Sequence, residues 1–329
     1  MKTIFAAFFL FASLCQFLTA EDPVPAKGHD LNASKSFTIA VLPDTQFYCD
    51  TRLKLSKKWG NGDLRRYFFE QTRWVRDNQK RLNVVFLVHE GDIVQADAHE
   101  EWAIAKEAMS ILDGHVPYCL CLGNHDLTTE DSLDRWLKVA PEFFPDGHPE
   151  YLLDTPDGVV YVMPNHWCAT PYYWGEMQDP QFSSDQHNVF NDALMATSKD
   201  MQVFVTHSPV FGFPPAQTLL SEPLHEPAGA FSNTIGNLTA AHPGIRCVLG
   251  AHNHMNMHIE KTKVHYVTVS AFVESPFEFK LFEMQSDLLS MTTISLADRL
   301  PFKADYDKDK TFVQGRMIDR SFTHLNNIS

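Results

Sequence analysis

The stretch PYCLCLGNHD, residues 117–126, passes from apolar residues directly into a glycine followed by three polar residues. Four other stretches repeat this layout: FTIAVLPD (37–44), VVFLVHEGD (84–92), MQVFVTHSP (201–209) and IRCVLGAHNH (245–254). Continuous apolar runs of this length are typical of strands that are covered on both faces. The sequence therefore predicts several buried strands, each followed by polar or small residues.

Segments with helical spacing of apolar residues separate these runs. They cover residues 63–81, 100–112 and 186–196. Strand, helix, strand order predicts crossover connections and a layered α/β fold. In such sheets the ligand site lies outside the carboxyl ends of the strands, so the polar residues that end the runs are expected to meet there.

The second half of the chain adds strands of another kind. Residues 264–272, 277–285 and 290–297 indicate strands that are at least partly antiparallel, and residues 151–164 indicate a hairpin around a Pro-Asp-Gly turn. Residues 164–184 are rich in aromatic residues, proline and glycine and have no clear period. We expect a long surface loop there, and such loops are often functional.

The polar residues at the predicted strand ends are of the types that bind metals. A lone histidine or aspartate after a strand is more often a hydrogen-bonded or helix-capping residue than a ligand. Together, however, the strand ends supply enough oxygen and imidazole donors for two divalent cations. The candidate ligands are Asp44, Gln46, Asp92, Asn124, His207, His252 and His254.

The order of these residues resembles the pattern of the calcineurin-like metallophosphoesterase superfamily. That pattern is D-x-H, G-D, G-N-H-[DE], H and G-H-x-H. This chain has D-x-Q at 44–46, G-D at 91–92, G-N-H-D at 123–126, a histidine at 207 and H-x-H at 252–254. The resemblance covers residues 37–272. It implies a β-sandwich flanked by helices, an α/β/β/α arrangement, with a centre of two divalent cations.

Carried over position by position, the resemblance assigns a role to each candidate. Asp44, Gln46 and His254 would bind the first cation, Asp92 would bridge both, and Asn124, His207 and His252 would bind the second. In the family the cations share a hydroxide that attacks phosphorus. His125 would protonate the leaving oxygen, and Asp126 would either orient His125 or anchor its loop.

Three positions depart from the family pattern. Gln46 replaces a histidine, and its amide oxygen would favour Mn²⁺, Mg²⁺ or Fe²⁺ over Zn²⁺. The alternative is that Gln46 only forms hydrogen bonds nearby. Ala251 stands where a glycine is usual, which is tolerable unless the backbone needs a positive φ. Gln95 stands where purple acid phosphatases have a metal-binding tyrosine, which argues against an iron site of that kind.

The ends of the chain differ in composition from its middle. Residues 1–20 have one early lysine, an apolar run and small residues at the end, which is typical of a secretory signal peptide. We therefore expect a secreted or periplasmic protein with no membrane span after cleavage. Residues 36–298 would form one phosphoesterase domain, and residues 299–329 would form a polar C-terminal tail draped over the surface.

Charge and cysteine content narrow the possible partners. A net charge of −14 argues against nucleic acid as a partner, but cations in a site can still attract a small phosphorylated substrate. The cysteines show no CxxC spacing, and Cys119 and Cys121 are expected to be buried thiols rather than a disulfide framework.

These observations predict a secreted, metal-dependent hydrolase of phosphate esters. The motifs do not distinguish a monoesterase from a phosphodiesterase or nucleotidase, because specificity resides in the loops. The alternative from another class is a catalytically silent, metal-binding scaffold protein. The presence of His125 beside a full set of ligands argues against that alternative.

Overall fold

The computed structural model describes residues 37–46, 64–96, 99–155, 157–175, 179–197, 199–274, 277–297, 299–300 and 313–325. The expected signal peptide lies outside these residues. Within them, no helix combines the length and apolar character needed to cross a membrane. The boundaries expected for the domain stay a prediction.

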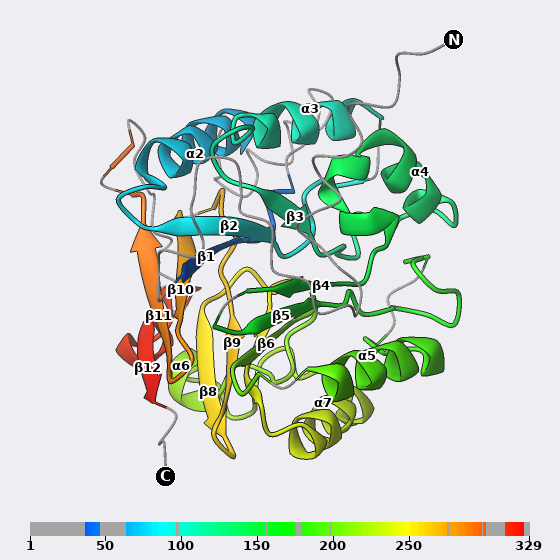
Figure 1. Cartoon of the computed structure of the whole chain (residues 1–329), viewed down its shortest axis with the longest axis vertical. Helices are drawn as coiled ribbons and strands as arrows, with labels where there is room; N and C mark the ends of the chain where they lie inside the picture. The colour runs from blue at the N-terminus through cyan, green and yellow to red at the C-terminus, as the bar shows by residue number, and fades with distance from the viewer. Residues whose placement is uncertain are drawn as a thin grey trace.

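Two six-stranded sheets pack face to face, as Figure 1 shows. The first has the order β12-β11-β10-β1-β2-β3, with β1–β2 and β2–β3 parallel and the other pairs antiparallel. Its strands are β1 (Phe37–Leu42), β2 (Val84–His89), β3 (Tyr118–Leu120), β10 (Glu278–Met284), β11 (Leu288–Ser295) and β12 (Ser321–Leu325).

The second sheet has the order β4-β5-β6-β7-β9-β8. Its central pairs, β5–β6, β6–β7 and β7–β9, are parallel, and antiparallel pairs form both edges. Its strands are β4 (Tyr151–Asp154), β5 (Val159–Val162), β6 (Gln202–Val205), β7 (Ile245–Gly250), β8 (Met257–Lys261) and β9 (Val264–Thr268). The pair β4–β5 is the expected hairpin.

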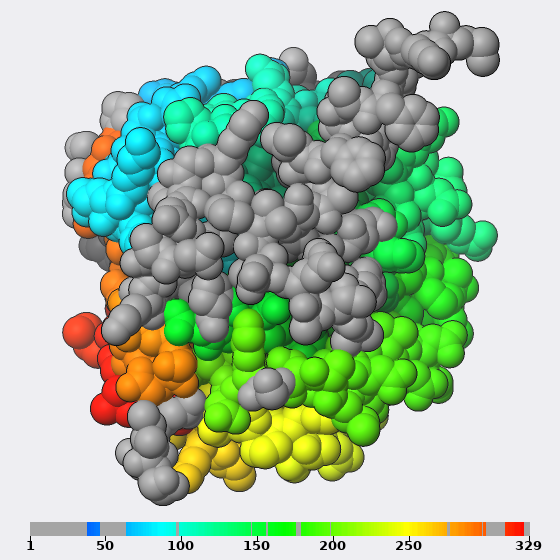
Figure 2. Space-filling view, in the orientation of Figure 1, coloured from blue at the N-terminus to red at the C-terminus, as the bar shows by residue number. Residues whose placement is uncertain are grey.

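Helices cover the outer face of each sheet. Over the first sheet lie α2 (Leu64–Asn78), α3 (His99–Ser110) and α4 (Ser132–Val139), and over the second lie α5 (Ser184–Ala196) and α7 (Gly229–Ala241). The short helix α6 (Pro215–Thr218) follows the loop after β6. Figure 2 shows the outer helices from the same direction, with α2 in cyan at the upper left and the region of α7 in yellow-green to yellow at the bottom. The expected α/β/β/α sandwich is confirmed.

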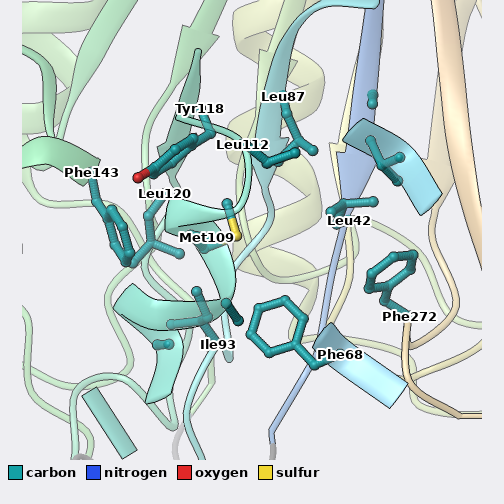
Figure 3. Packing of buried hydrophobic residues seen from close by; sticks show 14 of the residues in the cluster. Leu42, Phe68, Leu87, Ile93, Met109, Leu112, Tyr118, Leu120, Phe143 and Phe272 are labelled. Atoms are coloured by element: carbon teal, nitrogen blue, oxygen red, sulfur yellow. The ribbon is translucent and has the colours of Figure 1, made fainter. Parts of the chain in front are cut away.

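Three apolar layers hold the sandwich together. In the outer layer over the first sheet, Phe68 of α2 and Met109 of α3 pack against Leu42 and Leu87 of the strands, as Figure 3 shows. A middle layer fills the space between the sheets, and it includes Cys119 and Cys121 as buried free thiols. Because each central strand is covered on both faces, its sequence is apolar throughout, as the continuous runs predicted.

The structure adds elements that the sequence did not predict. These include α4, α6, α7, β8 and β12. Strand β12 pairs antiparallel with β11, so residues 321–325 extend the first sheet and are not a tail draped over the surface. The expected loop at 164–184 is irregular in its described parts, but its beginning is not at the surface. Asn165, His166 and Trp167 are buried, and His166 and Gln181 form an isolated bridge.

Candidate metal centre

All seven candidate ligands lie at the carboxyl-end edge that the parallel strands of the two sheets share. Asp44 and Gln46 follow β1, Asp92 follows β2 and Asn124 follows β3 in the first sheet. His207 follows β6, and His252 and His254 follow β7, in the second. A hydrogen bond connects the residues of the two sheets: the His252 backbone N–H donates to Asp44 Oδ1 at 3.2 Å. The two sheets therefore contribute to one site.

The backbone leaves the strands in an unusual conformation at these positions. Asp44, Asp92, His252 and His254 have φ of 49°, 52°, 66° and 58°, in the left-handed region that non-glycine residues rarely adopt. Several such residues at the same site indicate that the fold holds local strain there, as functional sites often do.

Two glycines let the loops approach each other. Gly91 has φ of 98°, and a Cβ there would lie 2.6 Å from His207 Nδ1. A Cβ on Gly123 would lie 2.2 Å from Asp92 Oδ1. No larger residue fits at either position without moving a candidate ligand. The lack of room for a side chain thus explains the glycines of the G-D and G-N-H-D motifs.

Asp92 is at the centre of the site and is fully buried. Its Oδ1 accepts a hydrogen bond from the His125 backbone N–H at 2.8 Å, and its Oδ2 accepts one from Gln46 Nε2 at 2.8 Å. His207 Nε2 lies 3.3 Å from Oδ2. Ligand atoms of Asp92, His207 and His252 all lie within 4.8 Å of one another.

The second-cation side, consisting of Asn124, His207 and His252, is held by directed hydrogen bonds. His207 Nδ1 donates to the Glu90 carbonyl at 2.7 Å, so Nε2 is the ring nitrogen that faces the site. His252 Nδ1 lies 2.9 Å from Asn124 Oδ1. The ring of Trp167 lies 4.8 Å from that of His252 and fixes its orientation.

The first-cation side, consisting of Asp44, Gln46 and His254, is organised differently. In the structure Gln46 faces Asp92 with its amide nitrogen, which is the hydrogen-bonding alternative for this residue. A half-turn of the amide would present its oxygen instead. His254 Nδ1 lies 3.3 Å from Oε2 of Glu274, a residue that no sequence motif marks.

The carboxylates give the site a negative field. Burial raises the pKa of Asp44 to about 7. Burial opposes the charged form of the imidazoles, but Asp92 and Asp44 outweigh it and raise the pKa of His207 to about 9. In the same way, Glu274 and Asp44 outweigh burial and raise the pKa of His254 to about 10. Positive charge is therefore stabilised on both sides of the site.

His252 is the exception among these imidazoles. Its burial, followed by the repulsion from His207, lowers its pKa to about 3. A neutral imidazole is the form that binds a metal, so His252 has its donor lone pair available at neutral pH.

Two of the candidate ligand atoms are buried without a hydrogen-bond partner in the described part of the chain, as expected where a cation binds. Asp44 Oδ2 and His207 Nε2 are buried atoms without a hydrogen-bond partner among the described residues. Buried polar atoms without partners are costly, and they are rare unless an ion or water satisfies them. Carboxylate, amide and imidazole groups are suitable ligands for Mn²⁺, Fe²⁺, Mg²⁺ or Zn²⁺.

His125 lies beside this centre and is partly exposed. Its Nδ1 is 2.7 Å from the Gln95 carbonyl, and because a carbonyl can only accept, Nδ1 carries the proton. The side-chain amide of Gln95 lies 2.9 Å from the same nitrogen. The indole of Trp174 lies 4.8 Å from the imidazole ring. Nε2 is thus the ring nitrogen available to a substrate.

Asp126 contacts the backbone rather than the His125 ring. Its carboxylate accepts hydrogen bonds from the N–H groups of Asp92, Gly123 and Val94 at 2.8, 2.9 and 3.2 Å. These bonds join the loop after β2 to the loop after β3. Of the two roles weighed for Asp126, the contacts favour anchoring of the loops.

Ala251 illustrates a departure from the family pattern that the fold accommodates. It is buried, its φ is negative and its N–H donates to the His207 carbonyl at 2.8 Å. The positive φ in this turn falls on His252 instead. An alanine therefore fits where a glycine is usual.

Comparisons with known proteins agree with the geometry. A family model described as calcineurin-like phosphoesterase matches residues 37–256. The uncharacterized protein YvnB of Bacillus subtilis is 31% identical over 135 residues, which are 40% of this chain and 9% of that protein. The chain thus corresponds to a small part of that relative.

Solved structures with the same fold have low sequence identity. A dimetal phosphatase from Danio rerio superposes with a TM-score of 0.56 at 15% identity, covering 88% of this chain and 99% of that one. The purple acid phosphatase PPD1 of yellow lupin gives 0.58 at 12% identity, with coverage of 92% and 55%. GAP50, described as the anchor in the inner membrane complex of Plasmodium, gives 0.54 at 14%, with coverage of 89% of both chains.

Proposed function

We propose that this chain, which belongs to the calcineurin-like phosphoesterase family, hydrolyses phosphate esters with two divalent cations. The observation that carries the proposal is the convergence of Asp92, His207 and His252, whose ligand atoms lie within 4.8 Å of one another. Asp44 and His254 adjoin this group, and buried donor atoms on both sides have no hydrogen-bond partner among the described residues.

Each candidate ligand has a place in this proposal. Asp44, Gln46 and His254 would hold the first cation, Asp92 would contribute to both, and Asn124, His207 and His252 would hold the second. When bound, the cations would supply a water acidic enough to act as nucleophile near neutral pH and would neutralise charge on the phosphoryl group.

His125 is the proposed acid for the leaving oxygen. The bond from Nδ1 to the Gln95 carbonyl keeps the ring oriented, so that Nε2 can hold a proton toward the substrate. Gln95 and Trp174 act as positioning residues, because both contact the imidazole and neither is a candidate ligand. Asp126 is a positioning residue for the two loops.

A hydrolysis panel tests the proposal. The full chain would be assayed with p-nitrophenyl phosphate, bis(p-nitrophenyl) phosphate and nucleotides, with Mn²⁺ and with a chelator. We expect turnover of at least one ester with Mn²⁺ and none with the chelator. The pattern across the panel assigns the substrate class, whether monoester, diester or nucleotide.

The matched variant is His125→Gln, which keeps a polar side chain of similar size. Turnover should fall about 10²–10⁴-fold, as for loss of a general acid, while the Mn²⁺ content stays that of the parent. A parent chain that binds Mn²⁺ but hydrolyses nothing in the panel would support the metal-binding scaffold instead.

Export is the proposed location of this activity. The support is the sequence of residues 1–20 alone. Mass spectrometry of the N-terminus of the protein recovered from the medium or periplasm tests it. A mature chain that begins at Glu21 is expected, and an intact Met1 on cell-associated protein would contradict it.

A further inference from the structure

Glu274 lies beside the first-cation side, yet it belongs to none of the motifs. It follows β9 and is half-buried, with Oε2 3.3 Å from His254 Nδ1. The exposed fraction of its side chain is 25%, and that of His254 is 26%. Their contact is therefore partly shielded from water, where an ion pair is stronger than at a fully exposed surface.

The turn that carries Glu274 is anchored to the end of β1 and to helix α2. Two residues earlier, the Phe272 backbone N–H donates to the Pro43 carbonyl at 3.0 Å, and its carbonyl accepts from Gln71 Nε2 at 2.8 Å. Phe272 itself is fully buried. Because Pro43 directly precedes Asp44, the same anchor fixes Glu274 relative to the first-cation side.

The contact determines which nitrogen of His254 is available. A carboxylate accepts a hydrogen bond, so Nδ1 keeps its proton and Nε2 is the nitrogen that can give its lone pair to a cation. A carboxylate on the far nitrogen also makes an imidazole a stronger metal ligand. On the second-cation side the equivalent partner of His207 is only a neutral backbone carbonyl, that of Glu90.

The two sides also differ in their other donors. Asn124 and two imidazoles serve the second cation, whereas the first has one imidazole, because Gln46 stands where the family pattern has histidine. An amide oxygen is a neutral donor with less affinity than imidazole for the later transition metals. Without compensation, the first cation would be the more weakly held.

We propose that Glu274 is a positioning residue that strengthens His254 as a ligand and so compensates for Gln46 in retaining the first cation. This inference rests on the proposed function of the site as a two-cation centre. It concerns two residues that are distant in sequence, Gln46 and Glu274, and it assigns both of them to the same cation.

Calorimetric titration of the chelator-treated full chain with Zn²⁺, a cation that prefers imidazole to an amide oxygen, tests the inference, with metal content measured in parallel. Glu274→Gln should weaken one of two bound ions about 10–100-fold and leave the other unchanged. The control is Glu100→Gln, which removes an exposed carboxylate from the first turn of α3 and should bind both ions as the parent does.

Rescue separates a role at the metal from a role in folding. In the double variant Gln46→His, Glu274→Gln, the added imidazole should restore the affinity for the weakened ion. A defect in the turn alone would not be restored in this way and would lower the thermal unfolding midpoint. Parent affinity for both ions in Glu274→Gln would overturn the inference.

Two other results have distinct meanings. A parent chain that binds neither Zn²⁺ nor Mn²⁺ refutes the proposed function itself, whereas a parent with two ions and an unaffected Glu274→Gln refutes only the role of Glu274. If Glu274→Gln does not fold, Glu274→Asp decides instead: the shorter side chain draws its carboxylate away from His254 Nδ1, so one ion must bind more weakly than in the parent, and equal affinity for both ions overturns the inference.

Discussion

Two groups of three histidines lie in this molecule, and they differ in what surrounds them. The site group is His207, His252 and His254, at the carboxyl ends of β6 and β7. The strand group is His258, His265 and His324, on β8, β9 and β12. Carboxylates contact imidazoles of the first group, whereas the imidazoles of the second bond to one another.

The strand group forms a directed chain of hydrogen bonds. His258 Nδ1 donates to the Ile318 carbonyl at 3.0 Å, so its Nε2 accepts from His265 Nδ1 at 2.8 Å. His265 Nε2 in turn accepts from His324 Nδ1 at 3.0 Å. The ring of Phe322 stacks 4.0 Å from that of His265. The chain joins β12 of the first sheet to the edge of the second.

The pKa shifts differ where a carboxylate contacts the imidazole. Burial, together with repulsion from His258 and His324, lowers the pKa of His265 to about 3. In the site group, Asp92 and Glu274 raise the pKa of their partners His207 and His254 despite burial, whereas the pKa of His252 falls to about 3. Carboxylate neighbours, rather than clustered histidines as such, therefore stabilise positive charge.

Removing the central carboxylate should have the largest effect. Asp92→Asn keeps the shape of the side chain but removes the charge that both cations would share. We expect loss of bound Mn²⁺ and a fall in turnover of about 10³-fold, comparable to the loss of a key charge-stabilising group. Metal analysis and the hydrolysis assay on the same sample measure both.

Asp134→Asn is the matched control, because Asp134 is an exposed carboxylate on α4. It should retain both the metal content and the turnover of the parent. Should Asp92→Asn also retain two ions and full turnover, the carboxylates would not be what distinguishes the site group from the strand group.

Breaking the strand group should affect stability and leave the site intact. His265→Leu removes the central member and leaves His258 Nε2 and His324 Nδ1 without their bonds to it. Loss of partners for buried polar atoms costs about 1–3 kcal/mol in the free energy of unfolding. Urea unfolding measures this cost, and an unchanged Mn²⁺ content excludes an effect on the site.

His324→Leu provides the graded comparison. His324 is half-buried and at the end of the chain of bonds, so its loss should cost less than that of His265. A cost for His324→Leu that equals or exceeds that for His265→Leu would contradict the order inferred from burial.

The position of the site could be predicted from the sequence because its residues follow strands. The apolar runs mark the strands, parallel strands share an edge, and the motifs then name Asp44, Asp92, Asn124 and His207. Gln46 could be named as a departure, but its amide orientation depends on Asp92, 46 residues away. Its role as a ligand stays a prediction.

Residues that act through another side chain could not be predicted. Glu274, Trp167 and Trp174 reach the site from turns whose paths depend on tertiary packing. Gln95 was notable only for what it replaces, and its contact with His125 required the loop geometry. For such residues the local sequence contains no periodic signal.

Missed elements divide into those with a signal and those without one. Helix α7 has apolar residues at Phe231, Ile235 and Leu238, a helical spacing that was available in the sequence. Strand β12 alternates between exposed and half-buried residues, so it has no fully buried face for a pattern to reveal. Its pairing with β11 and the bonds of His324 determine its position instead.

Restoring the family's histidine on the first-cation side should change the metal preference, an effect smaller than the loss of metal expected for Asp92→Asn. Gln46→His replaces an amide with an imidazole, a donor that Zn²⁺ prefers. The ratio of Zn²⁺ to Mn²⁺ affinity should rise on the order of tenfold, or about 1.4 kcal/mol. Competitive titration measures the ratio, and an unchanged ratio would mean that Gln46 does not contact the cation.

Acid should reveal a difference in stability between the two groups. His265 has a pKa of about 3 in the fold against 6.5 for an ordinary histidine, so the unfolded chain binds a proton that the folded chain does not. Stability from this group is complete above pH 6.5 and is lost as pH falls toward 3, by at most about 1.4 kcal/mol per pH unit. The pKa of His258 is lowered too, mainly by burial, although Asp319 and Glu260 oppose the shift.

Unfolding free energies of the parent and of His265→Gln, measured between pH 7 and pH 5 with chelator, should therefore depend on pH with different slopes, and the slope of the parent should be the steeper one. Equal slopes would show that His265 takes up a proton in the fold as readily as in the unfolded chain, and the difference between the two groups of histidines would then not lie in their protonation.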